Sequence, residues 1–197
     1  LIVRKPLVFY MLHEEQGYVF EIAKELGHEL RLIHHNRPTI SCAEKLDLLK
    51  ENLGFADWTL DRIVKSLYFS RNSSPFISVI TPEFNRNIKP KDIFPDALGM
   101  SRGGAERYWI NPKNVQKGMV WGTCTPFPLW SSIGGEISDL IFLDHPPIRD
   151  KLVDISVGGS SKEMFQTSMH LPYIAIYEIL KKQFGNSVHL YSLKTLL

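Results

Sequence analysis

Two apolar segments separated by a short polar turn constrain the fold of this chain more than any other feature. Residues 63–69, Ile-Val-Lys-Ser-Leu-Tyr-Phe, and residues 76–80, Phe-Ile-Ser-Val-Ile, both have the composition of strands. Residues 72–75 between them, Asn-Ser-Ser-Pro, have the composition of a turn. We therefore predict that the two segments pair as a buried hairpin.

The other periodic segments are short and divide between helix and strand patterns. Helices are expected at 14–26, 41–53, 90–98 and 172–184. At the start of the second helix, Ser41 and Glu44 have the spacing of a capping box. Further strands are expected at 29–35, 107–110, 139–143, 152–157, 162–168 and 188–193. Because strands outnumber helices and many neighbouring strands lack a helical crossover, we expect an α+β fold. Its sheet is mixed and largely antiparallel, with helices packed outside.

Length and composition are those of one globular domain that spans residues 1–197. The 197 residues are 44% hydrophobic and 22% charged, with no repeat and no apolar run long enough to cross a membrane. Residues 1–6 lack the features of a signal peptide, and only two cysteines occur. We therefore expect a cytoplasmic setting and no membrane partner.

Positive charge is concentrated in one part of the chain, although the net charge is only +2. Residues 86–117 contain seven basic side chains, Arg86, Lys89, Lys91, Arg102, Arg107, Lys113 and Lys117, against the acidic Asp92, Asp96 and Glu106. Such a strip is either a solvated face or a surface for a phosphate-bearing partner. The sequence is compatible with a phosphate-bearing partner but does not require one.

Lys65 is the most informative single residue for chemistry. Period-2 alternation puts it on the same face of its strand as Ile63, Leu67 and Phe69, which is the more apolar face. A buried ammonium is costly without a partner. Either the side chain extends along the apolar surface to water at the rim of the sheet, or a polar or anionic group pairs with it.

Two common kinds of site have weak sequence support. The seven histidines show neither zinc-knuckle nor HExxH spacing, and neighbours such as His34 and His35 point to opposite faces of a strand. Cys124 lies in an irregular loop and could act as a nucleophile, but nothing in the sequence places a histidine base beside it. We therefore expect no metal, and Cys124 is more typical of a small buried apolar residue.

A third kind of site combines Lys65 with two glycine-containing loops. The first is Gly122-Thr123-Cys124-Thr125-Pro126 and the second is Gly158-Gly159-Ser160. Glycine lets the backbone approach a ligand and present N–H groups, Pro126 stiffens the first loop, and Thr125 offers a hydroxyl. Together these groups could bind an ester through its carbonyl oxygen or a phosphate.

Four segments in this order resemble the YbaK/prolyl-tRNA-synthetase-associated editing domains, which hydrolyse the ester of mischarged aminoacyl-tRNA. Ile63 to Leu67 match that family's lysine-bearing strand, and Phe76 to Ile80 match the next strand. Gly122 to Phe127 match its GxxxP loop, and Val157 to Ser160 match its second glycine turn. The resemblance covers residues 20–170 and leaves an N-terminal extension and an extra C-terminal helix and strand.

The resemblance implies a partly barrel-like sheet and an aminoacyl-tRNA deacylase that needs no cofactor, metal or protein nucleophile. Lys65 would engage the 3′-terminal adenosine or its phosphate, and the Gly122–Pro126 loop would stabilise the oxyanion. Water or the free ribose hydroxyl would attack. The implied catalytic residues are Lys65, Gly122 and Thr125. The implied substrate-binding residues are Thr123, Cys124, Pro126, Phe127, Gly158, Gly159 and Ser160.

The resemblance also implies the partners of the protein. These are the 3′ end and acceptor stem of a tRNA, with tRNA(Pro) carrying a small amino acid as the expected substrate, and an aminoacyl-tRNA synthetase; DNA is not expected. Two alternatives remain open. One is a noncatalytic tRNA-binding or synthetase-associated module of the same fold, and the other is a Cys124-dependent hydrolase.

Overall fold

The structure is a computed structural model of the 197-residue chain. It describes residues 14–35, 39, 41–72, 75–83, 88–110, 125–157 and 167–192.

The first part of the fold follows the expected order of helix, strand and helix. The elements are η1 (Glu14–Gln16), α2 (Tyr18–Glu25), β1 (Arg31–His34) and α3 (Cys42–Leu53). Ser41 caps α3, since its hydroxyl accepts a hydrogen bond from the Glu44 N–H at 3.2 Å. Gly54 ends α3 with φ = 74°, in the left-handed region that glycine adopts without strain. The capping-box prediction is confirmed at its N-cap.

The predicted hairpin is also present. After η2 (Leu60–Arg62), β2 (Ile63–Ser70) pairs antiparallel with β3 (Phe76–Pro82), and Lys65 lies opposite Thr81. The short strand β4 (Trp109–Ile110) pairs with the end of β2 at Phe69 and Ser70. The expected strand at 107–110 is therefore only two residues long, because Arg107 belongs to the turn that follows a helix.

The remaining elements complete the sheet and its covering helices. They are α4 (Pro90–Leu98), α5 (Arg102–Ala105), η3 (Trp130–Ser132), β5 (Ile137–Asp144), η4 (Pro146–Ile148), β6 (Leu152–Ser156), β7 (Thr167–Pro172), α6 (Tyr173–Phe184), η6 (Gly185–Ser187) and β8 (Val188–Ser192). Of the expected strand at 162–168, residues 162–166 lie outside the described part of the chain; the described strand β7 continues beyond residue 168 to Pro172, the residue that caps α6. Its apolar alternation includes Met169 and Leu171, both fully buried.

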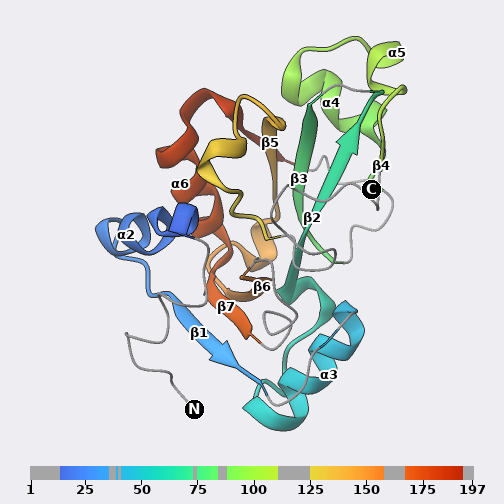
Figure 1. The fold of residues 1–197 in the computed structure, drawn as a ribbon. Helices are drawn as coiled ribbons and strands as arrows, with labels where there is room; N and C mark the ends of the chain where they lie inside the picture. The colour runs from blue at the N-terminus through green and yellow to red at the C-terminus, as the bar shows by residue number, and fades with distance from the viewer. Residues whose placement is uncertain are drawn as a thin grey trace.

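One mixed sheet connects all these parts (Figure 1). Its strand order is β1-β7-β6-β2-β3-β5-β8, with β4 beside β2. The β1–β7, β7–β6, β2–β3 and β2–β4 pairs are antiparallel, whereas β6–β2, β3–β5 and β5–β8 are parallel. The sheet is open, since no pairing joins β1 to β8 within the part of the chain that the structure describes. The predicted α+β class with a mixed sheet is confirmed.

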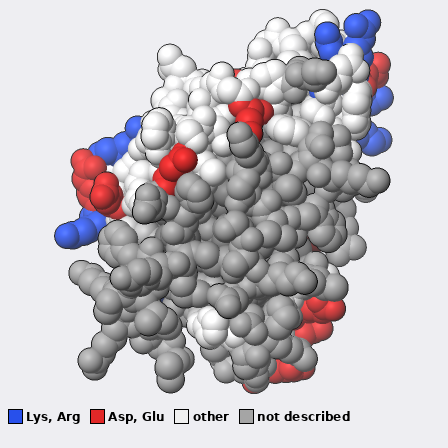
Figure 2. Space-filling view, in the orientation of Figure 1, with Lys and Arg blue, Asp and Glu red and all other residues white. Residues whose placement is uncertain are grey.

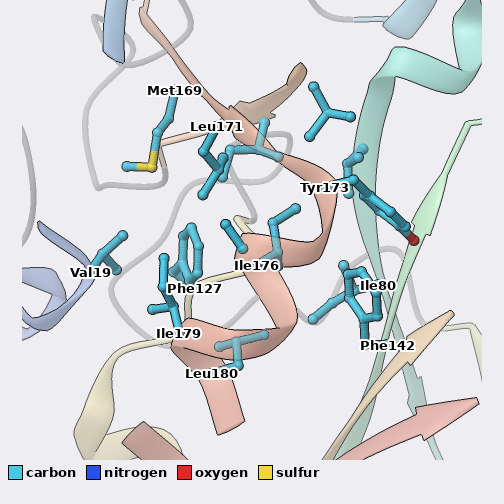
Figure 3. Packing of buried hydrophobic residues seen from close by; sticks show 14 of the residues in the cluster. Val19, Ile80, Phe127, Phe142, Met169, Leu171, Tyr173, Ile176, Ile179 and Leu180 are labelled. Carbon is cyan, nitrogen blue, oxygen red and sulfur yellow. The ribbon is translucent and has the colours of Figure 1, made fainter. Parts of the chain in front are cut away.

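The two faces of the sheet carry different cores. On one face, α2 and α6 cover the largest apolar cluster, where Phe127, Phe142 and Tyr173 pack with Ile176 and Ile179 of α6 (Figure 3). On the other face, α4 and α5 cover a cluster around Phe69 and Phe94, while α3 covers a smaller cluster around Leu49 and Trp58. The second face is thus divided between two groups of helices.

Among the described residues, no helix combines the length and apolar character needed to cross a membrane.

Candidate functional site

Lys65 projects from the divided face of the sheet, as the alternation in its strand predicts. Ile63, two residues before it, belongs to the cluster under α3, whereas Leu67 and Phe69 pack in the cluster under α4 and α5. The Lys65 side chain lies between these two clusters and is 24% exposed. An ammonium is therefore held at the boundary between two apolar cores.

Glu83 is the partner of Lys65. It follows β3 directly, and its N–H donates to the Ile63 carbonyl at 2.9 Å, which fixes its backbone beside the start of β2. Lys65 Nζ lies 2.6 Å from Glu83 Oε2, and the Glu83 side chain is only 10% exposed. Of the two possibilities for a lysine on this face, the structure shows pairing with an anionic group.

A row of polar side chains continues from this ion pair across the sheet. The strand registers place Ile63 beside Asp154 of β6, Asp154 beside His170 of β7, and Ser168 beside Ile33 of β1. Register partners share a face, and residues two apart along a strand also share it. The row crosses five neighbouring strands and comprises His35, Ser168, His170, Asp154, Lys65 and Glu83.

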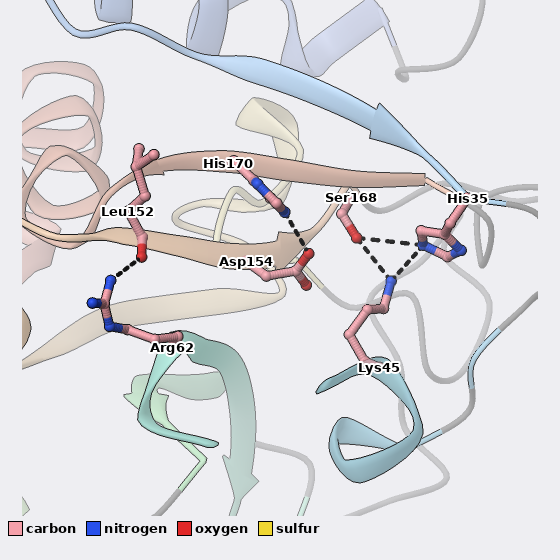
Figure 4. A network of polar contacts seen from close by, with 7 residues as sticks. All are labelled: His35, Lys45, Arg62, Leu152, Asp154, Ser168 and His170. Atoms are coloured by element: carbon pink, nitrogen blue, oxygen red, sulfur yellow. Dashed lines mark hydrogen bonds and ion pairs between the residues drawn. The ribbon is translucent and has the colours of Figure 1, made fainter. Parts of the chain in front are cut away.

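Helix α3 lies over this row and adds two side chains to it. Lys45 Nζ donates to Ser168 Oγ at 2.8 Å and to His35 Nε2 at 2.7 Å (Figure 4). Cys42, the first residue of α3, has a thiol that hydrogen-bonds Glu83. Because the two residues are three apart, they lie on the same face of the helix. Lys45 thus contacts the β1–β7 end of the row, and Cys42 contacts the β3 end.

The centre of the row is a fully buried carboxylate. Asp154 is 2% exposed and accepts a hydrogen bond from His170 Nε2 at 2.9 Å. His170 is itself buried against the rings of Phe55 and Trp58, whose centroids lie 5.2 and 5.1 Å from its own. A buried polar pair of this kind is satisfied internally and fixes the relation of β6 to β7.

The charged groups in the row shift one another's pKa values. Burial alone would raise the pKa of Asp154, but the Lys45 charge and hydrogen bonds from His170 and Ser168 lower that pKa below its ordinary value. Burial lowers the pKa of Lys45, while the negative charge of Asp154 opposes that change. At neutral pH Asp154 is therefore an anion that Lys45 and His170 stabilise.

Cys42 is a poor nucleophile in this environment. Burial, together with the nearby Glu83 carboxylate, raises the pKa of its thiol to about 12, although the Lys65 charge acts in the opposite direction. A thiol with this pKa is almost entirely protonated at neutral pH, and thiolate is the reactive form. Cys42 is thus a hydrogen-bond donor to Glu83.

The first predicted glycine loop is described only at its end, from Thr125 to Phe127. Tyr68 donates to the Thr125 carbonyl at 3.5 Å, and Gln16 Nε2 donates to the Phe127 carbonyl at 2.6 Å. Tyr68 and Phe127 both belong to the core under α2 and α6, which is the face opposite Lys65. Thr125, Pro126 and Phe127 are buried in this core. Their described contacts therefore lie on the face of the sheet opposite Lys65.

The other predicted site residues lie outside the described part of the chain. These are Gly122, Thr123, Cys124, Gly158, Gly159 and Ser160. Their roles stay predictions.

Several residues of the row were missed by reasoning from the sequence. Asp154 occurs in the apolar strand Leu152-Val153-Asp154-Ile155, so the argument applied to Lys65 also identifies it as a charge that needs a partner. His170 similarly lies between Met169 and Leu171. By contrast, Glu83 and Lys45 follow ordinary turn and helix patterns, and only the packing of α3 against the sheet brings them to the row.

Metal ligation has no support in the described ranges, where no group of three or more His, Cys, Asp or Glu side chains is placed to hold an ion.

Comparisons with known proteins show the fold. No protein-family model matches the chain, and no curated protein matches it in sequence. Among solved structures, the crystal structure of a hypothetical protein is similar, with a TM-score of 0.54 and 19% identity over 87% of this chain and 97% of that one.

Two further solved structures have the same fold. One is a candidate trans-editing enzyme for prolyl-tRNA synthetase, with a TM-score of 0.54 and 12% identity over 92% of this chain and 97% of the other. The second comes from a study that grafted epitopes onto scaffold proteins by computational design, with a TM-score of 0.53 and 14% identity over 94% and 100% of the two chains. At these identities the likeness defines a fold shared with a candidate editing enzyme.

Proposed function

We propose that this protein is an aminoacyl-tRNA deacylase that hydrolyses the ester of a mischarged tRNA, with tRNA(Pro) carrying a small amino acid as the substrate. The observation that carries the proposal is the placement of Lys65. Its ammonium is held between two apolar cores by the Glu83 carboxylate, at the strand position that resembles the lysine strand of the editing domains. The shared fold of a candidate trans-editing enzyme supports the same assignment.

In this proposal, Lys65 binds the phosphate of the terminal adenosine and fixes the ester. Residues 122–124 of the first loop supply backbone N–H groups to the carbonyl oxygen, and the Gly158-Gly159-Ser160 turn forms a wall of the amino-acid pocket. Thr125 has no role in this proposal, because its hydroxyl accepts a hydrogen bond from the Phe127 N–H in the core opposite Lys65. Preorganised N–H donors stabilise the oxyanion that develops when the carbonyl is attacked. The protein then contributes positioning and charge stabilisation, and the chain needs no nucleophile of its own.

The reaction is an ordinary ester hydrolysis. Water forms a bond to the carbonyl carbon and gives up a proton, and the bond between that carbon and the ribose oxygen breaks. The ribose oxygen takes up a proton, so the products are a free amino acid and a deacylated tRNA. The carbonyl oxygen carries negative charge only in the intermediate, where N–H donors have their greatest effect.

The test of this function is a panel of charged tRNAs. Purified protein is incubated with Ala-, Cys-, Ser- and Thr-tRNA(Pro) and with correctly charged Pro-tRNA(Pro), and loss of the labelled amino acid is followed against the spontaneous rate. The proposal expects hydrolysis of at least one small mischarged amino acid well above that of Pro-tRNA(Pro). Tight tRNA binding with no hydrolysis across the panel would identify a noncatalytic binding module and overturn the deacylase.

A further inference from the structure

Two large apolar side chains are exposed next to each other on β4. Trp109 is 47% exposed and Ile110 is 45% exposed. Of the five large apolar side chains that are exposed in the described part of the chain, only these two are neighbours in sequence. Single exposed apolar residues need no explanation, but tryptophan is enriched at contact surfaces, where its ring has a partner. This end of β4 therefore has the character of a binding surface.

The fold holds Trp109 in this exposed position. β4 pairs antiparallel with the end of β2, where Trp109 lies opposite Ser70. The residue before it, Tyr108, packs against Phe94 in the core under α4 and α5, with ring centroids 5.4 Å apart and the ring planes at 80°. Side chains alternate in an extended chain, so Trp109 points away from that core. The exposed indole thus belongs to an anchored segment.

A cation without a carboxylate partner lies two residues before this indole. Arg107 is exposed, and within the described ranges its side chain forms no ion pair. Arg102, in α5, is 72% exposed and lies 3.6 Å from Asp92, in a surface pair of the kind that contributes little to stability. Figure 2 shows Lys and Arg side chains gathered at this corner of the molecule, with acidic ones beside them. Arg107 can therefore bind a phosphate without breaking a salt bridge.

An exposed aromatic ring beside such a cation fits single-stranded RNA. Unpaired bases stack on aromatic rings, while Arg and Lys bind the phosphates of the same strand. Bases inside a duplex stack on one another and offer no free face to a side chain, so a ring of this kind selects unpaired nucleotides. The proposed substrate ends in such a strand, because the 3′ end of a tRNA extends beyond its acceptor stem. The choice of tRNA as the partner rests on the proposed function.

The spacing of Trp109 and Lys65 suits this strand. Ser70, beside Trp109, follows Lys65 by five residues along β2, which is about 17 Å in an extended strand. Stacked nucleotides rise about 3.4 Å each and an extended RNA strand covers more, so a few unpaired nucleotides span this length. Ser70 and Lys65 point to opposite faces of β2, and among the described strands β4 pairs only with β2. An RNA strand can therefore pass round the free edge of β4 to reach Trp109.

We propose that Trp109 stacks on an unpaired base of the tRNA 3′ strand, upstream of the terminal adenosine that Lys65 binds in the proposed function. Arg107 binds a phosphate beside that base, so the surface holds the strand by one stack and one charge contact. Every base has a face that can stack, so the contact accepts any nucleotide and recognises that the end is unpaired. Trp109 positions the aminoacyl end and takes no part in the chemistry.

A basic corner alone would bind RNA through its phosphates. In that case the affinity would follow charge and salt concentration, and replacing Trp109 would have the same small effect on unpaired and paired RNA. Stacking predicts a different result, because only RNA with an unpaired end gains from the indole. Two RNAs that differ only in this end therefore separate the two modes of binding.

The experiment measures Kd by fluorescence anisotropy for two labelled RNA hairpins. One copies the acceptor stem of tRNA(Pro) with its unpaired 3′ end, and the other, the blunt hairpin, lacks that end. The wild type should bind the first more tightly. Trp109→Ala should weaken binding of the first by about five- to a hundredfold, the effect of losing one stacked base, and should change binding of the blunt hairpin by less than about twofold. Trp109→Phe should keep most of the affinity. The matched control is Trp130→Ala, which removes a tryptophan that is 58% exposed on η3.

Equal affinity of the wild type for the two hairpins, or an equal effect of Trp109→Ala on both, overturns the stacking role and leaves the deacylase intact. Unchanged RNA binding with lost binding to prolyl-tRNA synthetase would assign the surface to a protein partner and also overturn it. Absence of hydrolysis across the charged-tRNA panel overturns the deacylase, whereas the hairpin result, which needs no hydrolysis, still decides the role of Trp109. If Trp109→Ala fails to fold by circular dichroism, Trp109→Gln takes its place.

Discussion

Lys65 of β2 and Glu83, which directly follows β3, form an ion pair of 2.6 Å at one end of the row of polar side chains on the sheet. Their charges offset each other between the core under α3 and the core under α4 and α5. The pair therefore contributes both to the stability of the hairpin and to the electrostatics of the proposed site.

The contribution of this pair to stability can be measured with a double-mutant cycle. Lys65→Met and Glu83→Gln should each destabilise the protein, and the double variant should lose less than the sum, because removal of one charge leaves the other largely buried. We expect a coupling energy of about 0.5–3 kcal/mol by urea unfolding. Strictly additive effects would show that the two side chains do not interact in solution.

Asp154 should make the stability of the protein depend on pH. Because its pKa is lower in the folded than in the unfolded chain, its contribution is present above the unfolded pKa of about 4 and is lost as the pH falls through the folded value. At pH 7, Asp154→Asn should cost about 3–5 kcal/mol, since Lys45 and His170 lose a buried anion.

The measurement is the free energy of unfolding of wild type and Asp154→Asn between pH 7 and pH 3, with the exposed-site variant Asp57→Asn as a control. The difference in unfolding free energy between wild type and Asp154→Asn should become smaller below about pH 4. If this difference in unfolding free energy stays constant between pH 7 and pH 3, Asp154 is not an anion in the folded protein.

Experiments on the two cysteines should exclude a mechanism in which a cysteine thiolate attacks the ester. In a Cys124→Ser background, Cys42 is the one remaining cysteine. Because the pKa of its thiol is raised to about 12, only about one molecule in ten thousand carries the thiolate at pH 8. Iodoacetamide should therefore label it very slowly in the folded protein and quickly in urea.

The same Cys124→Ser variant should keep its deacylase activity within about twofold of the wild type, because the proposed reaction uses water. Loss of activity in this variant would instead support the Cys124-dependent hydrolase.

Much of the fold could be predicted from the sequence, because its strands and helices are marked locally. Ser41 and Gly54 bracket α3, and the turn composition of residues 72–75 marks the division between β2 and β3. The position of β7 was predicted less well, since Thr167 to Pro172 combine polar and apolar residues that are all buried or nearly so.

The site was harder to predict than the fold, since only some of its members stand out in their own segments. Lys65 is unusual in an apolar strand, and the same reasoning applies to Asp154. Glu83 and Lys45 are ordinary residues of a turn and a helix, and they reach the row only through the pairing of β2 with β3 and the packing of α3 on the sheet. Such long-range placement has no local signal in a single sequence.

Contact with tRNA should depend on the corner formed by α4 and α5. Figure 2 shows Lys and Arg side chains gathered there, next to acidic ones. Lys91 and Arg102 take part in exposed ion pairs with Glu106 at 3.4 Å and Asp92 at 3.6 Å. Exposed pairs of this kind contribute little to stability, so these cations can exchange partners for phosphates.

We therefore expect Arg102→Gln and Arg107→Gln each to weaken tRNA binding and to reduce the slope of log Kd against log salt concentration by about one. Lys182→Gln, at an exposed ion pair with Glu25, serves as the control. Unchanged slopes in both arginine variants would place the tRNA on another surface.

The most direct test of the account is the rate of deacylation of mischarged tRNA(Pro) by wild type and Lys65→Ala, with Lys50→Ala on the exposed side of α3 as the matched control. If Lys65 positions the terminal adenosine, its removal should lower kcat/KM by about a hundredfold or more, the scale at which misplacing a substrate slows catalysis. The control should match the wild type. Equal rates for wild type and Lys65→Ala, with both proteins folded, would contradict the proposed role of Lys65.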